Sequence, residues 1–457
     1  MNDTLKKLLK PIASLKLTVA LLAMSIVLIF AATWEQIDYG IWTIVEKYFR
    51  SFFVWIRFQI FLPRAKDVPG GFPWPGGYLI GPLLLVNLLA AHAVRFKMKA
   101  VGSRRLWGGV GIVASVAIIA WFHQSGYPEA IFGYRGNLAL ILIAAAAYAP
   151  LIIFTYVLFE KRTGIILIHT ALILLLVGEL IRGQMATESR MPIYEGQTIR
   201  YSHNIQECEL AITEPLDNQR DRVVAIAQPA LENAAGPIHV EALPFDIRVD
   251  SFMDNSQLRR LTQGEVSQAT AGFGRLYKIE PLSEVSGVAA QQTADMPSAV
   301  ITLLRAGQPI GTYLVSLWMS DAQFRPLGQT VRVDGRTFEL YLRWRRYYKP
   351  YSMKLIDFNH DTYTGTSIPK NFSSQIHLVD PSRHQDRDVL ISMNRPLRYH
   401  GETFFQASWL PGDAGTVLQV VDNPGRHLPY IACALGGIGL IIHFGFHLSK
   451  FLKSKQT

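Results

Sequence analysis

The chain has 457 residues, of which 49% are hydrophobic and 18% are charged, and its formal net charge is +10. This composition argues against a purely soluble protein, in which about 25% of the residues are usually charged. Only two cysteines are present, Cys208 and Cys433, and no CxxC motif occurs, which excludes a redox dithiol and a zinc knuckle.

Six stretches of the chain are apolar enough to be membrane spans. Each approaches the ~20 residues that cross a hydrocarbon layer of ~30 Å at ~1.5 Å per residue. They are 17–32, 77–94, 106–122, 138–159, 164–181 and 428–449. Three glycines, Gly108, Gly109 and Gly111, weaken the pattern of the third stretch. We therefore predict an α-helical transmembrane bundle of about six spans.

Lysine and arginine gather at alternate ends of these spans. Four clusters hold fourteen basic residues and only two acidic ones, Asp3 and Glu160, while the rest of the chain is nearly neutral. The basic residues are Lys6, Lys7, Lys10, Lys16, Arg95, Lys97, Lys99, Arg104, Arg105, Lys161, Arg162, Lys450, Lys453 and Lys455. The positive-inside rule predicts that all four clusters are cytoplasmic. A nucleic-acid partner is not needed to explain the net charge.

This topology divides the chain into five regions. Residues 1–32 form a cytoplasmic N-terminus and the first span, which lacks a small-residue cleavage site and is therefore expected to be a retained anchor. The others are an outer loop at 33–76, spans two to five at 77–182, an outer block at 183–427, and a last span with a basic tail at 428–457. In a bacterium this predicts a multi-pass protein of the inner membrane, with both termini cytoplasmic and the block in the periplasm.

The outer loop at 33–76 is rich in aromatic residues. Bases and aromatics recur at helical spacing over 41–56, which predicts an amphipathic helix. Two interpretations stay open: the helix lies in the lipid headgroup layer, or it is buried in a compact outer loop. Prolines and glycines at 63–77 then break regular structure, beginning with Pro63.

The block at 183–427 has the pattern of β-structure. Phe245, Ile247 and Val249 alternate with polar residues, and 338–342 and 417–421 are similar strand-like runs. Such runs, separated by Gly, Pro, Asn and Asp, predict a large all-β, sandwich-like domain that is mostly antiparallel. The Ala-, Gln- and Gly-rich pieces at 227–237 and 286–297 are expected to be surface loops.

Three histidines, His92, His169 and His443, lie inside predicted spans near the same membrane face. Their distances from Arg95, Arg162 and Lys450 put them ~5–10 Å below the cytoplasmic boundary. A buried imidazole is costly in lipid and stays neutral, and a neutral imidazole is a good axial ligand for heme iron. A common depth therefore predicts a heme or metal site. The alternative is that each histidine hydrogen-bonds a neighbouring helix.

Other polar residues near the membrane carry weaker predictions. Asn87 is expected to hydrogen-bond a neighbouring helix, and Glu179 to reach the headgroups. His447 is expected at the cytoplasmic interface. His123 and His427 adjoin the outer boundary, where contact with a partner stays open.

Several segments of the sequence are similar to those of one family. They are 13–18 before the first span, 47–53 in the outer loop, 87–89 with His92, Gly164 and Ile165 with His169 and Gly178, 193–198, 393–401, 404–408 and 422–425. The run Met393-Asn394-Arg395-Pro396-Leu397 is part of the segment most typical of that family. Together these segments resemble the ResB (CcsB) proteins of System II cytochrome c biogenesis. Those proteins usually have four spans, so 106–122 and 138–159 are two apparent additions.

This resemblance implies a function. Such a chain is one half of a complex that exports heme b and presents it for covalent attachment to the CxxCH motif of apocytochrome c. The family's second-span histidine is a transmembrane heme ligand, which implies that His92 is an axial ligand of the iron. The partner is a CcsA/ResC-like membrane protein, and its tryptophan-rich motif is absent from this sequence, so the synthase active site is expected on that partner.

Two other functions remain open from the residues. A b-type membrane cytochrome would need paired heme ligands, usually with a second heme nearer the outer face. A cofactor-free scaffold for assembly factors would leave the intramembrane histidines without a role.

Overall fold

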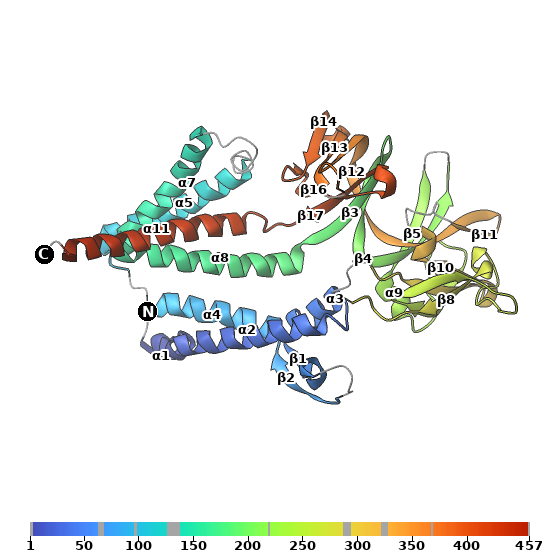
Figure 1. Ribbon diagram of the computed structural model, residues 1–457, viewed down its shortest axis with the longest axis horizontal. Helices are drawn as coiled ribbons and strands as arrows, with labels where there is room; N and C mark the ends of the chain where they lie inside the picture. The colour runs from blue at the N-terminus through green and yellow to red at the C-terminus, as the bar shows by residue number, and fades with distance from the viewer. Residues whose placement is uncertain are drawn as a thin grey trace.

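The computed structural model describes residues 3–62, 68–95, 98–125, 138–217, 220–286, 294–320, 328–366 and 369–455. Lys97 of the second basic cluster, Pro63 and residues 287–293 of one expected loop lie outside this described part. A helical part and a β-rich part adjoin, and both chain termini lie at the end of the helical part that is remote from the strands (Figure 1). The basic termini are therefore on one side and the block at 183–427 is on the other.

Apolar helices form the first part. They are α1 (Asp3–Ile12), α2 (Leu15–Glu35), α4 (Gly77–Arg95), α5 (Gly102–Gln124), α7 (Leu138–Phe159), α8 (Thr163–Met185) and α11 (Leu428–Lys455). In the described part of the chain, five stretches are long and apolar enough to cross a membrane, and one of them, Leu142–Met185, has 44 residues. That stretch includes α8 and most of α7, which the 3-10 turn η3 (Glu160–Arg162) separates. The prediction of a membrane protein with several apolar helices is confirmed.

Glycines let these helices approach closely. A Cβ atom on Gly164 of α8 would lie 2.7 Å from the backbone nitrogen of His443 and 2.8 Å from the carbonyl oxygen of Gly439, both in α11. In α5, a Cβ on Gly108 or Gly111 would overlap Leu158 or Phe154 of α7. Two of the three glycines that weaken the apolar pattern at 106–122 therefore make helix contacts, as small residues commonly do in membranes, whereas a Cβ on Gly109 would meet nothing within 4 Å.

Asn87 joins α4 to the N-terminal helices, as predicted. Its side-chain oxygen accepts a hydrogen bond from Thr18 Oγ1 at 2.6 Å. Its amide nitrogen donates to the carbonyl oxygen of Ser14 at 3.1 Å. Glu179 lies near the end of α8 that adjoins the strands. Its side chain is exposed and lies 3.4 Å from Arg182.

The outer loop differs from the predicted helix. Helical structure covers only α3 (Ile41–Ile44) and the π-helical turn η1 (Val45–Phe49), and a hairpin of β1 (Phe53–Arg57) and β2 (Gly71–Pro75) follows, with the 3-10 turn η2 (Phe58–Phe61) between its strands. The prediction is wrong beyond residue 50, because aromatics that fit helical spacing also fit the alternating burial of β1. Ile44 and Tyr48 are buried, which favours the compact-loop interpretation over a helix in the headgroup layer.

A buried carboxylate holds this loop against the end of α2. Glu35 is fully buried and accepts hydrogen bonds from Lys47 Nζ at 2.9 Å and from Arg57 Nε at 2.6 Å. The Tyr48 hydroxyl also donates to Glu35. A buried charge is tolerated when it is paired and hydrogen-bonded in this way.

The second part is rich in β-strands, and every strand pairing within the described ranges is antiparallel. The strands are β3 (Thr187–Tyr194), β4 (Thr198–Pro215), β5 (Asp221–Ala227), β6 (Asp246–Met253), β7 (Ser256–Arg260), β8 (Tyr277–Pro281), β9 (Ser298–Arg305), β10 (Gln308–Ser316), β11 (Gln329–Val333), β12 (Arg336–Thr362), β13 (Pro369–Asp380), β14 (Gln385–Ser392), β15 (Leu397–Tyr399), β16 (Glu402–Trp409) and β17 (Gly415–Asp422). A β-rich domain is therefore confirmed.

Ten of these strands form one sheet and β10, β9 and β6 form another. The 27-residue strand β12 crosses two hydrophobic cores. One core lies around Ile247, Ile301 and Leu340, where both sheets contribute, and the other lies around Met353 and Phe404. The segment of β12 between the two cores, residues 345–350, is called the waist below.

Short helical elements interrupt the strands. Within the expected loop at 227–237, α9 (Gln228–Glu232) is helical, so that expectation is corrected in part. The others are α10 (Leu317–Ser320), η4 (Phe273–Leu276), η5 (Pro381–Arg383) and η6 (Pro411–Asp413).

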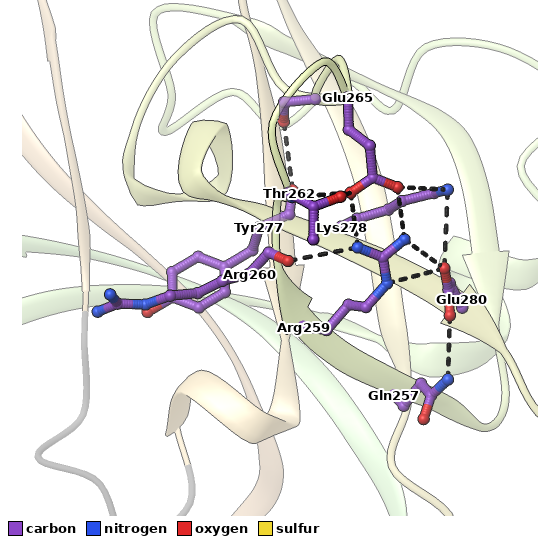
Figure 2. A network of polar contacts seen from close by, with 9 residues as sticks. Gln257, Arg259, Arg260, Thr262, Glu265, Tyr277, Lys278 and Glu280 are labelled. Atoms are coloured by element: carbon purple, nitrogen blue, oxygen red, sulfur yellow. Dashed lines mark hydrogen bonds and ion pairs between the residues drawn. The ribbon is translucent and has the colours of Figure 1, made fainter.

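An exposed ionic network closes the hairpin of β7 and β8 (Figure 2). Arg259 donates to both carboxylate oxygens of Glu265 at 2.6 Å and to Glu280 at 2.8 Å. The Arg259 guanidinium holds the pKa of Glu265 far below its usual range. Because the network is solvated and its charges are matched, it serves to hold the 261–276 loop in place.

Candidate functional site

His92 of α4 and His169 of α8 come together although 77 positions separate them in the sequence. Their ring centroids lie 5.0 Å apart with an angle of 62° between the ring planes. Both side chains are half-buried, and the atoms His92 Nε2 and His169 Nδ1 are fully buried. The sequence-based depth argument therefore identified two residues that meet across a helix interface.

The hydrogen bond of His92 determines which of its nitrogens is available. Nδ1 lies 3.0 Å from the carbonyl oxygen of Leu88, one turn earlier in α4. A carbonyl only accepts, so Nδ1 carries the proton and the lone pair is on Nε2. Metal-ligating histidines typically make such a bond with the second ring nitrogen, which fixes the tautomer and the ring orientation. His92 is thus chemically suited to bind iron through Nε2.

His443 lies apart from this pair. Its backbone meets Gly164, which precedes His169 by five residues in α8. At ~1.5 Å per residue, His443 is therefore ~7 Å nearer the basic end of the helices than His169. Its ring contacts are with Phe444 at 5.5 Å and His447 at 4.6 Å. The three histidines form a pair and a neighbour, rather than one three-sided site.

A second histidine pair lies at the opposite, β-side end of the helices. His123, 5% exposed near the end of α5, and His427, immediately before α11, have ring centroids 5.5 Å apart, again at 62°. His123 Nε2 lies 2.8 Å from the Tyr148 hydroxyl of α7. Arg426 Nε donates to His427 Nε2 at 3.1 Å. This pair joins the two apparent extra helices to the entry of the last one.

Sequence reasoning did not identify this second pair as a site. His123 and His427 were noted only as neighbours of the outer boundary, and nothing in the spacing of α5, α7 and α11 indicates that they meet. The sequence does contain one signal that could have indicated the pair, which is the depth of the two histidines. Each lies within one turn of the end of an apolar helix, on the side of the strands. Tyr148, a polar residue inside an apolar stretch, also belongs to this cluster through its contact with His123.

The charge and donor set around the first pair limits its chemistry. Among the described residues, no cluster of three or more His, Cys, Asp or Glu side chains could hold a metal ion. One or two imidazole ligands suit an iron whose remaining ligands belong to a macrocycle, as in heme. The two cysteine thiols are free, with Cys208 buried in the β-rich part and Cys433 exposed on α11.

Comparison with known proteins agrees with the family resemblance. Residues 314–417 match the family described as ResB-like family. Protein NrfI of Wolinella succinogenes is 36% identical over 102 residues, which is 22% of this chain and 11% of that protein. The cytochrome c biogenesis protein CcsB of Crocosphaera subtropica is 34% identical over 79 residues, 17% of each chain. CcsB of Picosynechococcus sp. is 37% identical over 81 residues, 18% of this chain and 17% of that protein.

These matches cover only part of this chain and a small part of each relative. The chain spans between 11% and 17% of the length of these relatives. The family match lies in the β-rich part, from β10 to β17, and includes the whole of β12. The resemblance to the ResB/CcsB proteins is confirmed, while the histidines of the helical part lie outside the matched region.

Proposed function

We propose that this chain, which matches the ResB-like family over residues 314–417, assists the export of heme across a membrane and its delivery for attachment to apocytochrome c. The relatives named above include cytochrome c biogenesis proteins, which supports the general role. The observation that carries the proposal is the His92–His169 pair, with His92 Nδ1 held by Leu88.

In this proposal His92 binds the iron of the exported heme b. The Leu88 carbonyl keeps the proton on Nδ1, and the lone pair of Nε2 is directed away from its own helix. Heme itself supplies four in-plane nitrogen ligands and two axial positions, and is treated as the cargo.

His169 is proposed to alternate with His92. Imidazoles on opposite faces of one iron would have centroids about 6 Å apart, given an iron–nitrogen bond of about 2 Å. The observed separation of 5.0 Å is shorter. One histidine at a time therefore binds iron in this arrangement, and the second axial ligand comes from a partner. His443, nearer the basic end, is proposed as a site of first contact.

The proposed setting is the bacterial inner membrane. Six crossings follow if α7 and α8 cross separately, since 44 residues of continuous helix would measure ~66 Å, more than twice the hydrocarbon thickness. The basic clusters are then cytoplasmic and the β-rich part is periplasmic, where its two main sheets pack as a sandwich. His92 would meet heme in the cytoplasmic leaflet, on its way outward.

A CcsA/ResC-like membrane protein is the proposed partner. It would supply the second axial ligand and the active site for attachment to the CxxCH motif. This chain would then be a subunit of the synthase complex rather than its catalytic half.

Coexpression tests this function. The chain, a CcsA/ResC-like partner and a reporter apocytochrome c are produced in a bacterial host that lacks its own maturation system. Heme-stained cytochrome c is expected only when both membrane proteins are present, and the purified complex should show a heme absorption band. Full maturation with the partner alone would contradict the proposal.

The second histidine pair favours one other function, a b-type membrane cytochrome. Two stacked hemes would need histidine pairs near opposite ends of the helices, which is where these two pairs lie, although both centroid separations, 5.0 Å and 5.5 Å, are shorter than two axial imidazoles of one iron require. Redox titration of the purified chain separates the proposals. Two hemes with distinct midpoint potentials would support electron transfer, whereas one heme or none without the partner supports the transport function.

A further inference from the structure

The waist of the β-rich part contains two arginines and a histidine in a row, and no acidic side chain among the described residues pairs with them. Arg346 of β12 is the cross-strand neighbour of His203 in β4, and His203 is the neighbour of Arg190 in β3. Residues directly opposite each other on neighbouring strands share one face of a sheet. Arg190, His203 and Arg346 are called the cationic row. Arg190 and Arg346 therefore lie on either side of His203, two strands apart on one face of the sheet.

The other arginines of β12 show how Arg346 differs. Arg336 has Glu214 at 2.7 Å, Arg343 has Glu209 at 2.9 Å and Arg345 has Glu207 at 2.7 Å, and Lys349 also has a carboxylate partner, Glu402. No acidic side chain in the described part of the chain pairs with Arg346 or with Arg190. Arg346 Nε is also buried without a hydrogen-bond acceptor among the described residues.

Buried polar atoms are nearly always satisfied in native proteins, so each exception points to a missing partner. His203 Nδ1 is a second buried atom without a partner in the described ranges, next to the first. Burial, together with the charges of Arg346 and Arg343, lowers the pKa of His203 to about 4. The row thus combines two positive guanidinium groups with a neutral imidazole, which has a backbone hydrogen bond with Trp344, and no carboxylate of the described residues accepts from these groups.

Two backbone irregularities build this place. The pairing Trp344↔Cys208 is followed by Arg346↔His203, so β4 has extra residues at 204–207. The pairing Tyr348↔Tyr201 is followed by Met353↔Ile199, so β12 has extra residues at 349–352. Bulges re-aim side chains and occur often beside functional sites. The paired stretch of Arg346, Tyr347 and Tyr348 lies between two such bulges.

An aromatic surface adjoins the cations. Tyr201 and Tyr348 are cross-strand neighbours two residues from the row, on the same face, with ring centroids 5.9 Å apart. The Arg346 guanidinium lies 4.1 Å from the centre of the Tyr201 ring. Arg190 is exposed and Tyr348 is 60% exposed, so the surface is open to a ligand.

We infer that the cationic row binds a carboxylate group of a flat, largely apolar ligand that lies against Tyr201 and Tyr348. Arginine binds a carboxylate through two parallel N–H donors, which gives both strength and orientation. This inference rests on the proposed function, because a propionate-bearing porphyrin is the ligand of this class that the function provides. It places a holding point for the ligand outside the membrane, distinct from the histidine pair in the helices.

Metal-free protoporphyrin IX is the probe that separates this site from the histidine pair, because it carries both propionates and no iron. The full chain is placed in lipid nanodiscs, and binding is followed by porphyrin fluorescence with empty nanodiscs as the blank. Arg346→Gln is expected to weaken binding about tenfold, the loss of one charge-assisted bidentate contact. Arg190→Gln should weaken binding by a smaller factor. Arg190 is exposed, so this substitution is expected to leave the fold of the waist unchanged.

Arg345→Gln is the matched control, since Arg345 is the adjacent residue of the same strand, projects from the opposite face and already has Glu207. It should bind the probe as the unchanged chain does. The dimethyl ester of protoporphyrin has no carboxylate. It should therefore bind the unchanged chain and Arg346→Gln with equal affinity.

Equal binding of acid and ester, or equal binding by the unchanged chain and both the Arg190 and Arg346 variants, would overturn the inference. Displacement by inorganic phosphate without any preference for acid over ester would identify a phosphate site and overturn it too. His92→Ala should leave probe binding unchanged. If maturation proves independent of this chain while the acid preference persists, the proposed function fails and the carboxylate site stands.

Discussion

The two histidine pairs have nearly the same ring geometry and differ in what holds each ring. The centroids lie 5.0 Å apart for His92 and His169 and 5.5 Å apart for His123 and His427. His92 bonds a backbone carbonyl of its own helix through Nδ1. In the other pair the Nε2 atoms bond side chains, Tyr148 and Arg426. Proximity alone therefore does not make a ligand pair, because the second partner of each ring decides which lone pair is available.

The largest expected difference between the pairs is in cytochrome c maturation. His92→Ala should reduce heme retention by the complex about 100-fold, because an axial ligand is lost, and maturation should fall with it. Exogenous imidazole should restore part of the activity. His123→Ala is the control and should leave both quantities nearly unchanged at normal protein abundance. Heme spectra and heme staining measure these outcomes, and normal maturation by His92→Ala would remove the ligand assignment.

A histidine of the β-rich part, His203, provides a reference for the pairs, because burial and two neighbouring arginines lower its pKa. The folded-state pKa of His203 is about 4, below the value near 6.5 of an unperturbed histidine. As the pH falls, the unfolded chain therefore binds the proton first. This contribution to stability is complete above pH 6.5 and is lost between pH 6.5 and pH 4, and we expect a loss of about 2 kcal/mol after allowance for partial exposure.

Urea titrations of the full chain in detergent at pH 7 and pH 4.5 would measure that loss. His203→Gln should show a smaller decrease in unfolding free energy between the two pH values than the unchanged chain. Equal decreases would mean that other groups carry the acid sensitivity.

The role of His169 sharpens the comparison within the first pair. If it alternates with His92, His169→Ala should lower heme retention about tenfold, less than loss of His92, and the double variant should resemble His92→Ala. His447→Ala, an exposed histidine near the same membrane face, is the matched control. A larger effect of His169 than of His92 would reverse the assignment of the principal ligand.

The smallest expected effect concerns the second pair. Tyr148→Phe removes the hydroxyl at 2.8 Å from His123 Nε2 and should cost about 1 kcal/mol of unfolding free energy, as single hydrogen bonds between membrane helices do. Denaturation in detergent measures it, and maturation should be unaffected. Loss of maturation at full stability would give the second pair a direct role in transport.

Features that depend on neighbouring residues in the sequence could be predicted, whereas features that depend on residues far apart in the sequence could not. The depths of His92 and His169 follow from their distance to charged helix ends, which is local information. The strand at Phe53–Arg57 was missed, because its partner Gly71–Pro75 lies 18 positions away and the aromatic spacing suits both structures. The cationic row depends on three strands and two bulges, and no local pattern around Arg346 fixes that register.

The contact between Gly164 and Gly439 has a mechanical consequence. The helix α8 continues into β3, and β17 continues into α11, and these two strands pair from Thr187↔Asp422 to Tyr194↔Gly415. The segment of α8 and β3 and the segment of β17 and α11 are thus expected to move as one rigid body, which extends from the basic end of the helices into the large sheet (Figure 1). Rotation of α8 about its axis would separate both the glycine contact and the strand pairing. Any change in the distance between His92 and His169 must therefore come from movement of α4, with α2 attached through Asn87.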